Sequence, residues 1–158
     1  MQIRAATADD TEEMLALFPR LSDFPIPENR NPLHLWEGDA VMLREWSDGK
    51  RDDCLVYVAR DEDDSLLGMA MVTLREELLS HNASSHLEAI VVDKKAEGRG
   101  VGGALLTAVE EGACERGAKS MSLHVFARNA RARQIYERSG FDGELIRYIK
   151  SFSDDALS

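Results

Sequence analysis

The stretch EGRGVGGALL, residues 97–106, places four glycines within six positions and then continues directly into an apolar, helix-forming run. The residues before it, HLEAIVV at 86–92, end in three β-branched side chains and indicate a strand. A glycine-rich turn between a strand and a helix tolerates positive φ and allows another molecule to approach the main chain. Because the first amides of a helix are unpaired and carry partial positive charge, this turn predicts a site for an anion such as a phosphate.

Three interpretations of the glycine run compete. In the first, the glycines serve only the geometry of a tight turn. In the second, Gly98, Gly100 and Gly103 form the GxGxxG spacing of a dinucleotide site. That site requires a carboxylate for the ribose about twenty residues later, where residues 123–125 offer only Leu, His and Val. In the third, the turn holds the pyrophosphate of coenzyme A.

Helix and strand patterns alternate along the chain on both sides of this turn. After it, we expect a helix over 103–117, a strand over 120–126, a helix over 129–140 and a last strand over 141–152. Before it, we expect a strand at 3–7, helices over 7–21 and from residue 31, a hairpin of 54–60 with 65–74, and the strand at 86–92. This order predicts an α/β fold of three layers, in which a mixed, mostly antiparallel sheet carries helices on both faces.

Size and composition limit the possible classes of protein. At 158 residues, with 44% hydrophobic and 30% charged residues, the chain predicts one domain over 1–158, with 153–158 as a frayed tail. We see neither a signal peptide nor an apolar run of membrane length, so we expect a cytoplasmic protein without a membrane partner. Cys54 and Cys114 belong to no CxxC pair, which agrees with a reducing compartment. Metal-ligand spacing is absent, so no metal is expected.

Charge is distributed unevenly along the chain. The net charge of −10 argues against a nucleic-acid partner, which needs a basic face. Residues 1–93 carry a net charge of −12, whereas residues 94–138, which include the glycine run, carry +4. Chance clustering of solvated charges is one explanation. The other is that one partner of the protein is anionic and another is cationic.

In residue types, spacing and order of elements, residues 86–141 resemble the GNAT superfamily of acyl-CoA N-acyltransferases, and the resemblance extends over residues 1–150. The motif of that family is Gln or Arg, two residues, Gly, one residue, then Gly or Ala. Gly100 and Gly102 match it, and Glu97 stands where the family has Gln or Arg. The resemblance implies a GNAT-like fold, acetyl-CoA as cofactor, and direct transfer of the acetyl group to a primary amine in a ternary complex, by a monomer or homodimer. A binding module that keeps the coenzyme A site without turnover is the alternative.

The resemblance also implies cofactor-binding residues, which are Ile90, Val91, Val92, Gly100, Val101, Gly102, Gly103, Ala104, Asn129, Ala132 and Tyr136. The basic Arg99 and Arg133 are added as candidates for the anionic end of the cofactor, with solvated surface charge as the alternative. Arg99 would supply the positive charge that Glu97 lacks. Asn129 and Tyr136 are seven positions apart, so they share a helix face with the small Ala132. The family implies that Tyr136 is the general acid for the departing thiolate. A tyrosine packed in the core with a satisfied hydroxyl is the alternative.

The strand at 86–92 carries the candidate base. Alternation places His86, Glu88, Ile90 and Val92 on one face of the strand. A carboxylate among apolar neighbours in a central strand needs a cleft or a partner. The resemblance implies that Glu88 removes the proton of the amine, directly or through water, and our hypothesis adds His86 as its helper. A structural salt bridge of Glu88 is the alternative.

Recognition of the acceptor amine is the least specified part of the sequence. The candidate substrate-binding residues are Phe24, Trp36, Glu37, Asp39 and His86. Ordinary helix packing and solvation explain the first four equally well. The net charge of −12 over residues 1–93 favours a cationic amine, such as an aminoglycoside, a polyamine or a peptide amine.

Overall fold

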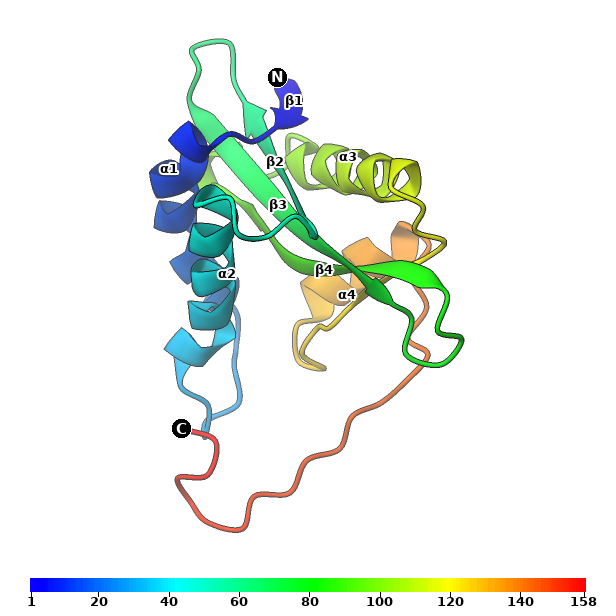
Figure 1. Cartoon of the computed structure of the whole chain (residues 1–158). Coiled ribbons are helices and arrows are strands. Elements are labelled where there is room, and N and C mark those ends of the chain that lie inside the picture. The colour runs from blue at the N-terminus through cyan, green and yellow to red at the C-terminus, as the bar shows by residue number, and fades with distance from the viewer.

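The computed structural model describes residues 1–158 and shows a five-stranded sheet with helices on both faces (Figure 1). The strands are β1 (Gln2–Ala5), β2 (Cys54–Arg60), β3 (Leu66–Glu76), β4 (Ala83–Val92) and β5 (Met121–Leu123). They lie in the order β1-β2-β3-β4-β5, and every neighbouring pair is antiparallel except β4 and β5, which are parallel. The predicted mixed, mostly antiparallel sheet is confirmed.

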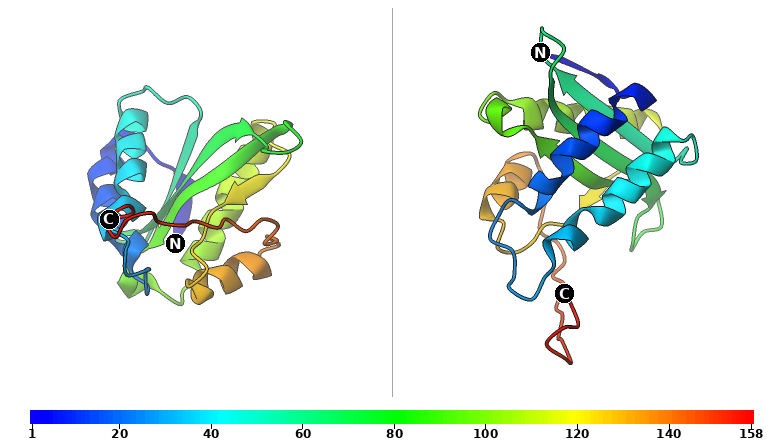
Figure 2. Two further views of the ribbon diagram at one scale, coloured as in Figure 1. Left: turned by 90° about the horizontal axis from the view of Figure 1, so that it is seen from below. Right: turned by 90° about the vertical axis from the view of Figure 1, so that its left-hand side faces the viewer.

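Helices form the outer layers of the fold. The α-helices are α1 (Thr11–Leu17), α2 (Glu37–Ser47), α3 (Val101–Glu115) and α4 (Ala130–Arg138). Short 3₁₀ helices cover Ala8–Asp10, Phe18–Ser22, Pro32–Leu35 and Lys94–Ala96. Helices α1 and α2 lie side by side over one face of the sheet, and α3 covers the other, as Figure 2 shows. The expected three layers are therefore present, with β4, α3 and β5 as the predicted βαβ unit.

The sheet separates two apolar cores, because successive strand side chains point to opposite faces. On the side of α1 and α2, the core contains Met14, Phe18, Leu43, Met69, Met71 and Val91. On the side of α3, it contains Leu67, Val72, Leu87, Leu105, Leu106 and Val109. Full burial of each such side chain contributes roughly 1.5–3 kcal/mol. The two cores hold the middle of the sheet rigid, and β4 belongs to both.

A bulge in β4 breaks the alternation of its side chains. Met71 of β3 pairs with Ala89. The next residue, Val72, pairs with Leu87, so Glu88 has no partner in the ladder. A bulge inserts one residue and turns the following side chains to the opposite faces. Bulges of this kind often direct a side chain toward a functional site.

This bulge makes one expectation wrong, namely that His86, Glu88, Ile90 and Val92 share a face. Ile90 and Val92 pack on the side of α3. Glu88 instead accepts a hydrogen bond from Thr73, whose strand neighbour Met71 packs toward α1 and α2. A strict period of two residues cannot anticipate an inserted residue.

The glycine run forms the predicted turn between β4 and α3. The helix begins at Val101, two residues earlier than expected, and ends at Glu115. Gly98 and Gly100 have φ values of 77° and 78°, in the left-handed region that favours glycine. Gly100 occupies the N-cap position, where it offers no side chain to the first turn of the helix.

The last expected strand is not formed. Residues 141–150 have no regular secondary structure, and the chain runs away from the sheet below α4 (Figure 1). β5 is also shorter than expected, at Met121–Leu123 instead of 120–126. The pattern of 141–152 is that of a strand, but a strand needs a neighbouring edge with which to pair. In this chain the edge of β5 and that segment remain apart.

Three further features concern membrane spans, cysteines and metal ligands. None of the helices combines the length and apolar character that a membrane span requires. Cys54 is buried and Cys114 is exposed, and both are free thiols. No group of three or more His, Cys, Asp or Glu side chains is arranged to hold a metal ion.

Candidate active site

The N-terminus of α3 presents main-chain donors without acceptors. The first backbone hydrogen bond of the helix runs from Ala104 N–H to the carbonyl of Gly100, at 3.1 Å. The amides of Val101, Gly102 and Gly103 therefore lack a partner within the protein, as the first turn of any helix does. With the partial positive charge of a helix N-terminus, these three amides form a cradle for an anion.

Gly103, in the first turn of α3, is exposed and has open space beside it. A Cβ atom added to Gly103 would meet no protein atom within 4 Å. Its φ is not in the left-handed region, so the turn does not require glycine here, and glycine in a helix costs roughly 0.5–1 kcal/mol relative to alanine. Turn geometry explains Gly98 and Gly100 but not Gly103. A glycine that neither packing nor φ demands fits close approach of a phosphate group.

Glu97 is turned toward two arginines. Its Oε1 lies 2.7 Å from Nη2 of Arg20, and its Oε2 lies 3.9 Å from Nη1 of Arg131. Arg20 also donates through Nε to the carbonyl of Val92, at 2.9 Å. The carboxylate in place of the family's Gln or Arg is thus neutralised by neighbours. Arg20 was not anticipated from the sequence, because it lies far from the glycine run in the chain and no local pattern marks it.

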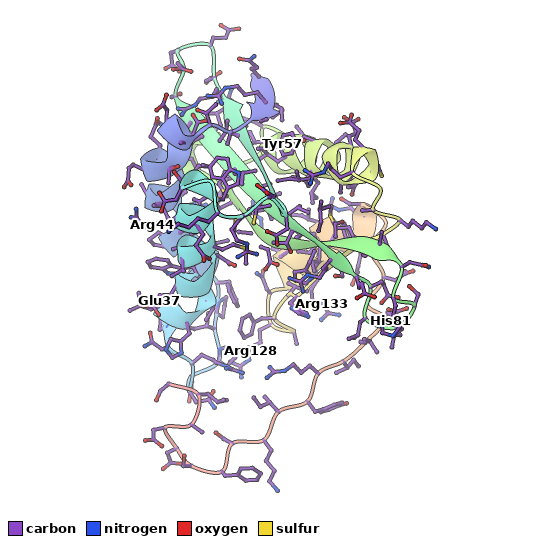
Figure 3. All side chains as sticks on the ribbon, in the orientation of Figure 1. Glu37, Arg44, Tyr57, His81, Arg128 and Arg133 are labelled. Atoms are coloured by element: carbon purple, nitrogen blue, oxygen red, sulfur yellow. The ribbon has the colours of Figure 1, made fainter.

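The other basic residues near the cradle have varied surroundings. Both terminal nitrogens of Arg99 bind Asp61 in the β2–β3 turn, at 3.2 and 3.3 Å. Arg133 donates to the carbonyl of Ala127, at 3.2 Å. Arg128 and Arg133 are seen near α4 in Figure 3, below the end of the sheet. Arg99 could reach a ligand only after leaving Asp61.

One edge of β4 is open beyond the bulge. β5 pairs with β4 only over Ser85–Leu87. The following residues of β4, which include the expected Ile90, Val91 and Val92, have β3 on one side and no strand on the other. Unpaired main-chain groups on such an edge can pair with an extended ligand. The open edge leads directly into the cradle at α3.

Tyr136 lies on α4 and packs against the core below α3. Asn129 caps this helix, because its Oδ1 accepts from the amide of Ala132, at 3.3 Å. The ring of Tyr136 meets the edge of Phe141, with centroids 5.9 Å apart. Burial raises the pKa of the Tyr136 phenol, so it stays protonated at neutral pH. Its hydroxyl makes no hydrogen bond within the protein and is accessible to solvent.

Glu88 has two donors from β3. Thr73 Oγ1 donates to its carboxylate at 2.7 Å, and Arg75 forms an ion pair with the same oxygen. The side chain of Glu88 is only 13% exposed. The salt bridge left open as an alternative from the sequence is therefore present. It holds the carboxylate in a fixed position, which a base also requires.

Two more titratable side chains belong to this cluster. Burial, together with the charge of Glu88, raises the pKa of Asp39 on α2 to about 7. Burial lowers the pKa of His86 on β4. Nδ1 of His86 lies 2.7 Å from Ser122 Oγ, and its ring lies 4.8 Å from the ring of His124. Two carboxyl groups and two imidazoles from α2, β4 and the end of β5 thus form one cluster between the layers.

The three remaining residues that were expected to bind the acceptor amine have different surroundings. Phe24 contacts Phe126, with ring centroids 5.5 Å apart, and so joins the α1–α2 connection to the chain after β5. Trp36 packs against the core beneath α1 and α2, which is the ordinary packing considered from the sequence. Glu37 is exposed at the start of α2 (Figure 3). Of the three, only Phe24 joins two loops from distant parts of the chain.

The unpaired amides at the N-terminus of α3 thus lie next to an open strand edge, and the same strand contributes to a partly buried cluster of acidic and imidazole side chains. Residues 14–141 match the model of the acetyltransferase (GNAT) family. The chain therefore belongs to the acetyltransferase (GNAT) family, and the fold expected from that resemblance is confirmed.

Individual relatives agree with this assignment. The mycothiol acetyltransferase of Beutenbergia cavernae is 34% identical over 90 residues, which are 57% of this chain and 29% of that protein. The chain thus spans about three tenths of the length of the curated relatives it matches. A variant of the BH1408 protein of Bacillus halodurans has a TM-score of 0.76 at 16% identity, covering 96% of this chain and 100% of that one. The ribosomal-protein-alanine N-acetyltransferase of Brucella melitensis biovar Abortus 2308 has a TM-score of 0.69 at 17% identity, with the same coverage.

Proposed function

We propose that the chain is an N-acetyltransferase that transfers the acetyl group of acetyl-CoA directly to a primary amine in a ternary complex. The observation that carries this proposal is the open space at Gly103, next to helix amides that have no acceptor. Membership of the acetyltransferase family supports the same reaction. The names of the relatives include acceptors as different as mycothiol and a ribosomal protein, so the acceptor is argued from this chain alone.

The cofactor would lie along the open edge of β4 and end in the cradle. The amides of residues 101–103 would hold the pyrophosphate. Main-chain groups of Ile90, Val91 and Val92 would pair with the pantetheine arm, as extended ligands pair with a strand edge. The remaining expected contacts are those of Arg99, Gly100, Ala104, Asn129, Ala132 and Arg133. Arg20 would keep the charge of Glu97 away from the phosphates.

Tyr136 would supply a proton on the cofactor side of the site. Acetyl-CoA supplies a thioester, whose leaving group is a thiolate. A thiol has a pKa near 8.5 and a phenol near 10, so the hydroxyl of Tyr136 can donate to sulfur as negative charge develops there. The hydroxyl is free for this role because no protein group binds it. Its raised pKa keeps the proton in place until then.

The acidic cluster would receive the proton of the amine. An amine with a pKa near 10.4 arrives protonated and must lose that proton before it attacks. Glu88 is the proposed base that takes this proton, and His86, two residues earlier on the same strand, is its proposed helper. Asp39 faces Glu88 from α2, and a carboxyl group with a pKa of about 7 exchanges protons readily near neutral pH. The pair of carboxyl groups would also attract a cationic substrate.

We expect the acceptor to be a small cationic amine or a peptide amine. The net charge of −12 over residues 1–93, which supply α1, α2 and most of the sheet, supports this class. The test is release of free thiol from acetyl-CoA in the presence of aminoglycosides, polyamines, amino acids and short peptides. Turnover with at least one cationic amine is expected. Binding of acetyl-CoA without thiol release for any amine would instead indicate the silent binding module.

A further inference from the structure

Arg75, near the end of β3, uses only one of its side-chain nitrogens for contacts within the protein. Its Nη2 donates to Thr73 Oγ1, at 3.2 Å, and forms the ion pair with Glu88. Neither Nε nor Nη1 makes a hydrogen bond within the protein. The side chain of Arg75 is 46% exposed, whereas that of Glu88 is 13% exposed. Because a guanidinium carries N–H donors on all of its nitrogens, most of this group is free to bind a ligand.

Arg60 shows how an arginine with a structural role is bound in this chain. Its side chain is 6% exposed. It donates through Nη1 to Glu13, at 2.9 Å, and through Nη2 to Asp10, at 2.6 Å. Both terminal nitrogens of that guanidinium are thus bound by protein carboxylates. Arg75 differs, because neutralising Glu88 occupies a single nitrogen and leaves the other nitrogens without a partner.

The position of Arg75 next to the proposed base limits which amines fit there. The reacting nitrogen must come within hydrogen-bond distance of Glu88, because that carboxylate is the proposed acceptor of its proton. Arg75 contacts the same carboxylate, so the free donors of its guanidinium lie next to that nitrogen. A guanidinium binds a carboxylate through parallel hydrogen bonds. A carboxylate group that is attached close to the reacting nitrogen is therefore within its reach.

We propose that Arg75 binds a carboxylate of the acceptor, so that the acceptor is a free amino acid. This inference rests on the proposed function and names the class of amine. In an amino acid a single carbon separates the amine from the carboxylate, which matches the adjacency of Glu88 and Arg75. Glu88 takes a proton from the nitrogen, a C–N bond to the acetyl carbon forms, and the C–S bond breaks, with the thiolate protonated by Tyr136. The carboxylate of the acceptor stays unchanged throughout.

Charge at contact distance favours such an acceptor over an amine that brings positive charge alone. Arg75 is the only cation that contacts Glu88, and it repels an ammonium group that approaches the base. A carboxylate on the same molecule compensates this repulsion. The net charge of −12 over residues 1–93 acts over longer distances, where salt screens it. It draws ammonium groups toward this part of the molecule, and Arg75 selects among them.

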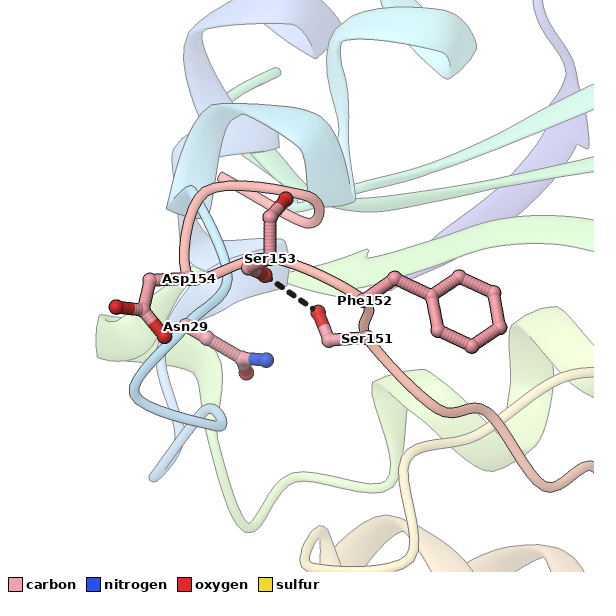
Figure 4. Close-up of a pocket in the computed structure, with 5 residues that line it drawn as sticks. All are labelled: Asn29, Ser151, Phe152, Ser153 and Asp154. Carbon is pink, nitrogen blue, oxygen red and sulfur yellow. Dashed lines mark hydrogen bonds between the residues drawn. The ribbon is translucent and has the colours of Figure 1, made fainter.

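Two other hollows of the structure offer no cation to a carboxylate. The first, of about 260 Å³, lies between Asn29 and residues 151–154, and Asp154 is its only charged side chain (Figure 4). The second, of about 350 Å³, lies between α3 and the strands β1 and β2, and its charged side chains are Glu111 and Glu115. A carboxylate would meet only like charge in either hollow. The half-exposed guanidinium on β3 is therefore the better partner.

A comparison of related acceptors tests the role of the carboxylate. The standard amino acids are screened for thiol release from acetyl-CoA, and the best acceptor is then compared with its amide and with its decarboxylated amine. The amide lowers and the decarboxylated amine raises the basicity of the nitrogen, so a preference for the acid over both cannot come from basicity. For the wild type, kcat/KM should be at least about tenfold higher for the acid than for either analogue.

Arg75→Gln distinguishes recognition of the carboxylate from support of Glu88. Loss of support lowers kcat/KM for all three compounds by the same factor, whereas loss of recognition lowers the ratio of acid to amide to about one. Arg75→Lys keeps the charge and should retain part of the preference. Arg44→Gln, which removes the exposed pair with Glu12, is the control and should keep the wild-type ratio.

Failure of this inference is distinguishable from failure of the proposed function. Equal kcat/KM for acid and amide in the wild type would overturn the carboxylate site alone, as would a preference that persists in Arg75→Gln. Turnover of an aminoglycoside or polyamine without turnover of any amino acid would have the same meaning. Absence of thiol release with every amine would overturn the proposed function and this inference with it.

Discussion

Arg20 and Glu97 lie 77 positions apart in the chain and form an ion pair, with Nη2 and Oε1 2.7 Å apart. The same guanidinium binds the carbonyl of Val92 at the end of β4. Arg20 therefore connects the 3₁₀ helix after α1 with the strand edge and the turn that frames the cradle. The carboxylate of Glu97 would otherwise be free to repel a phosphate group.

The first prediction follows from this ion pair. Arg20→Met releases the Glu97 carboxylate, so KM for acetyl-CoA should rise by about tenfold, which corresponds to roughly 1.4 kcal/mol. Adding Glu97→Gln should restore most of the affinity, because it removes the charge. Steady-state kinetics of the single and double variants measure this. Arg44→Met, which breaks the exposed pair with Glu12, is the control and should leave KM unchanged. Failure of Glu97→Gln to rescue would contradict the electrostatic role.

Tyr136→Phe tests the proposed general acid. We expect kcat to fall by roughly 10²–10⁴-fold, because proton donation to the leaving sulfur is lost. KM for acetyl-CoA and the melting temperature should change little, since the hydroxyl has no partner in the protein. Tyr148→Phe, an exposed tyrosine in the C-terminal segment, is the control. If the variant keeps kcat within about twofold of wild type, Tyr136 is not the acid.

Glu88→Gln tests the proposed base. The variant keeps an acceptor for Thr73 and Arg75 but cannot take up a proton. We expect kcat/KM to fall and the rise of its pH profile toward neutral pH to shift or flatten. The profile over pH 5 to 9 with one acceptor amine measures this. An unchanged profile would restrict Glu88 to its ion pair with Arg75.

Asp39→Asn tests the electrostatics of the cluster through stability. The folded pKa of Asp39, about 7, lies above its ordinary value of 3.8. Between these values the folded state binds a proton that the unfolded state has lost, so the free energy of unfolding falls as pH rises. Asparagine is neutral throughout, so the variant should gain on the order of 1–2 kcal/mol relative to wild type between pH 4 and pH 8. Urea unfolding at both pH values measures it, and an equal difference at both would refute the burial of Asp39.

Most of the fold could be predicted because each helix and strand is marked by a pattern in its own stretch of sequence. Thr7 and Asp10 have the spacing of a capping box, and the amide of Thr7 does donate to Asp10, at 2.8 Å. The hairpin of β2 and β3 and the βαβ unit follow from alternation and apolar runs. The prediction of a last strand was wrong, because a strand pattern does not tell whether a neighbouring strand edge is available for pairing. Residues 141–152 have the pattern and lack the neighbour within their own chain.

The site was less predictable, because its geometry depends on contacts between distant residues. The glycine run indicated the cradle, since the backbone conformation of Gly98 and Gly100 is a local property. The direction of Glu88 depends on one inserted residue in β4, which shifts the register without a sequence signal. Arg20 could not be found from any pattern near the turn. Arg75 offered a weak signal, as a charge that ends an otherwise apolar strand.

Gly103→Ala tests the cradle most directly, with Gly38→Ala as its matched control. Both glycines lie in the first turn of a helix, and neither replacement meets a protein atom within 4 Å. Each alanine should therefore stabilise the fold by roughly 0.5–1 kcal/mol. In calorimetric titration with acetyl-CoA, Gly103→Ala should bind at least about tenfold more weakly, whereas Gly38→Ala should bind like wild type. Wild-type affinity in Gly103→Ala would contradict the claim that the amides of α3 hold the cofactor.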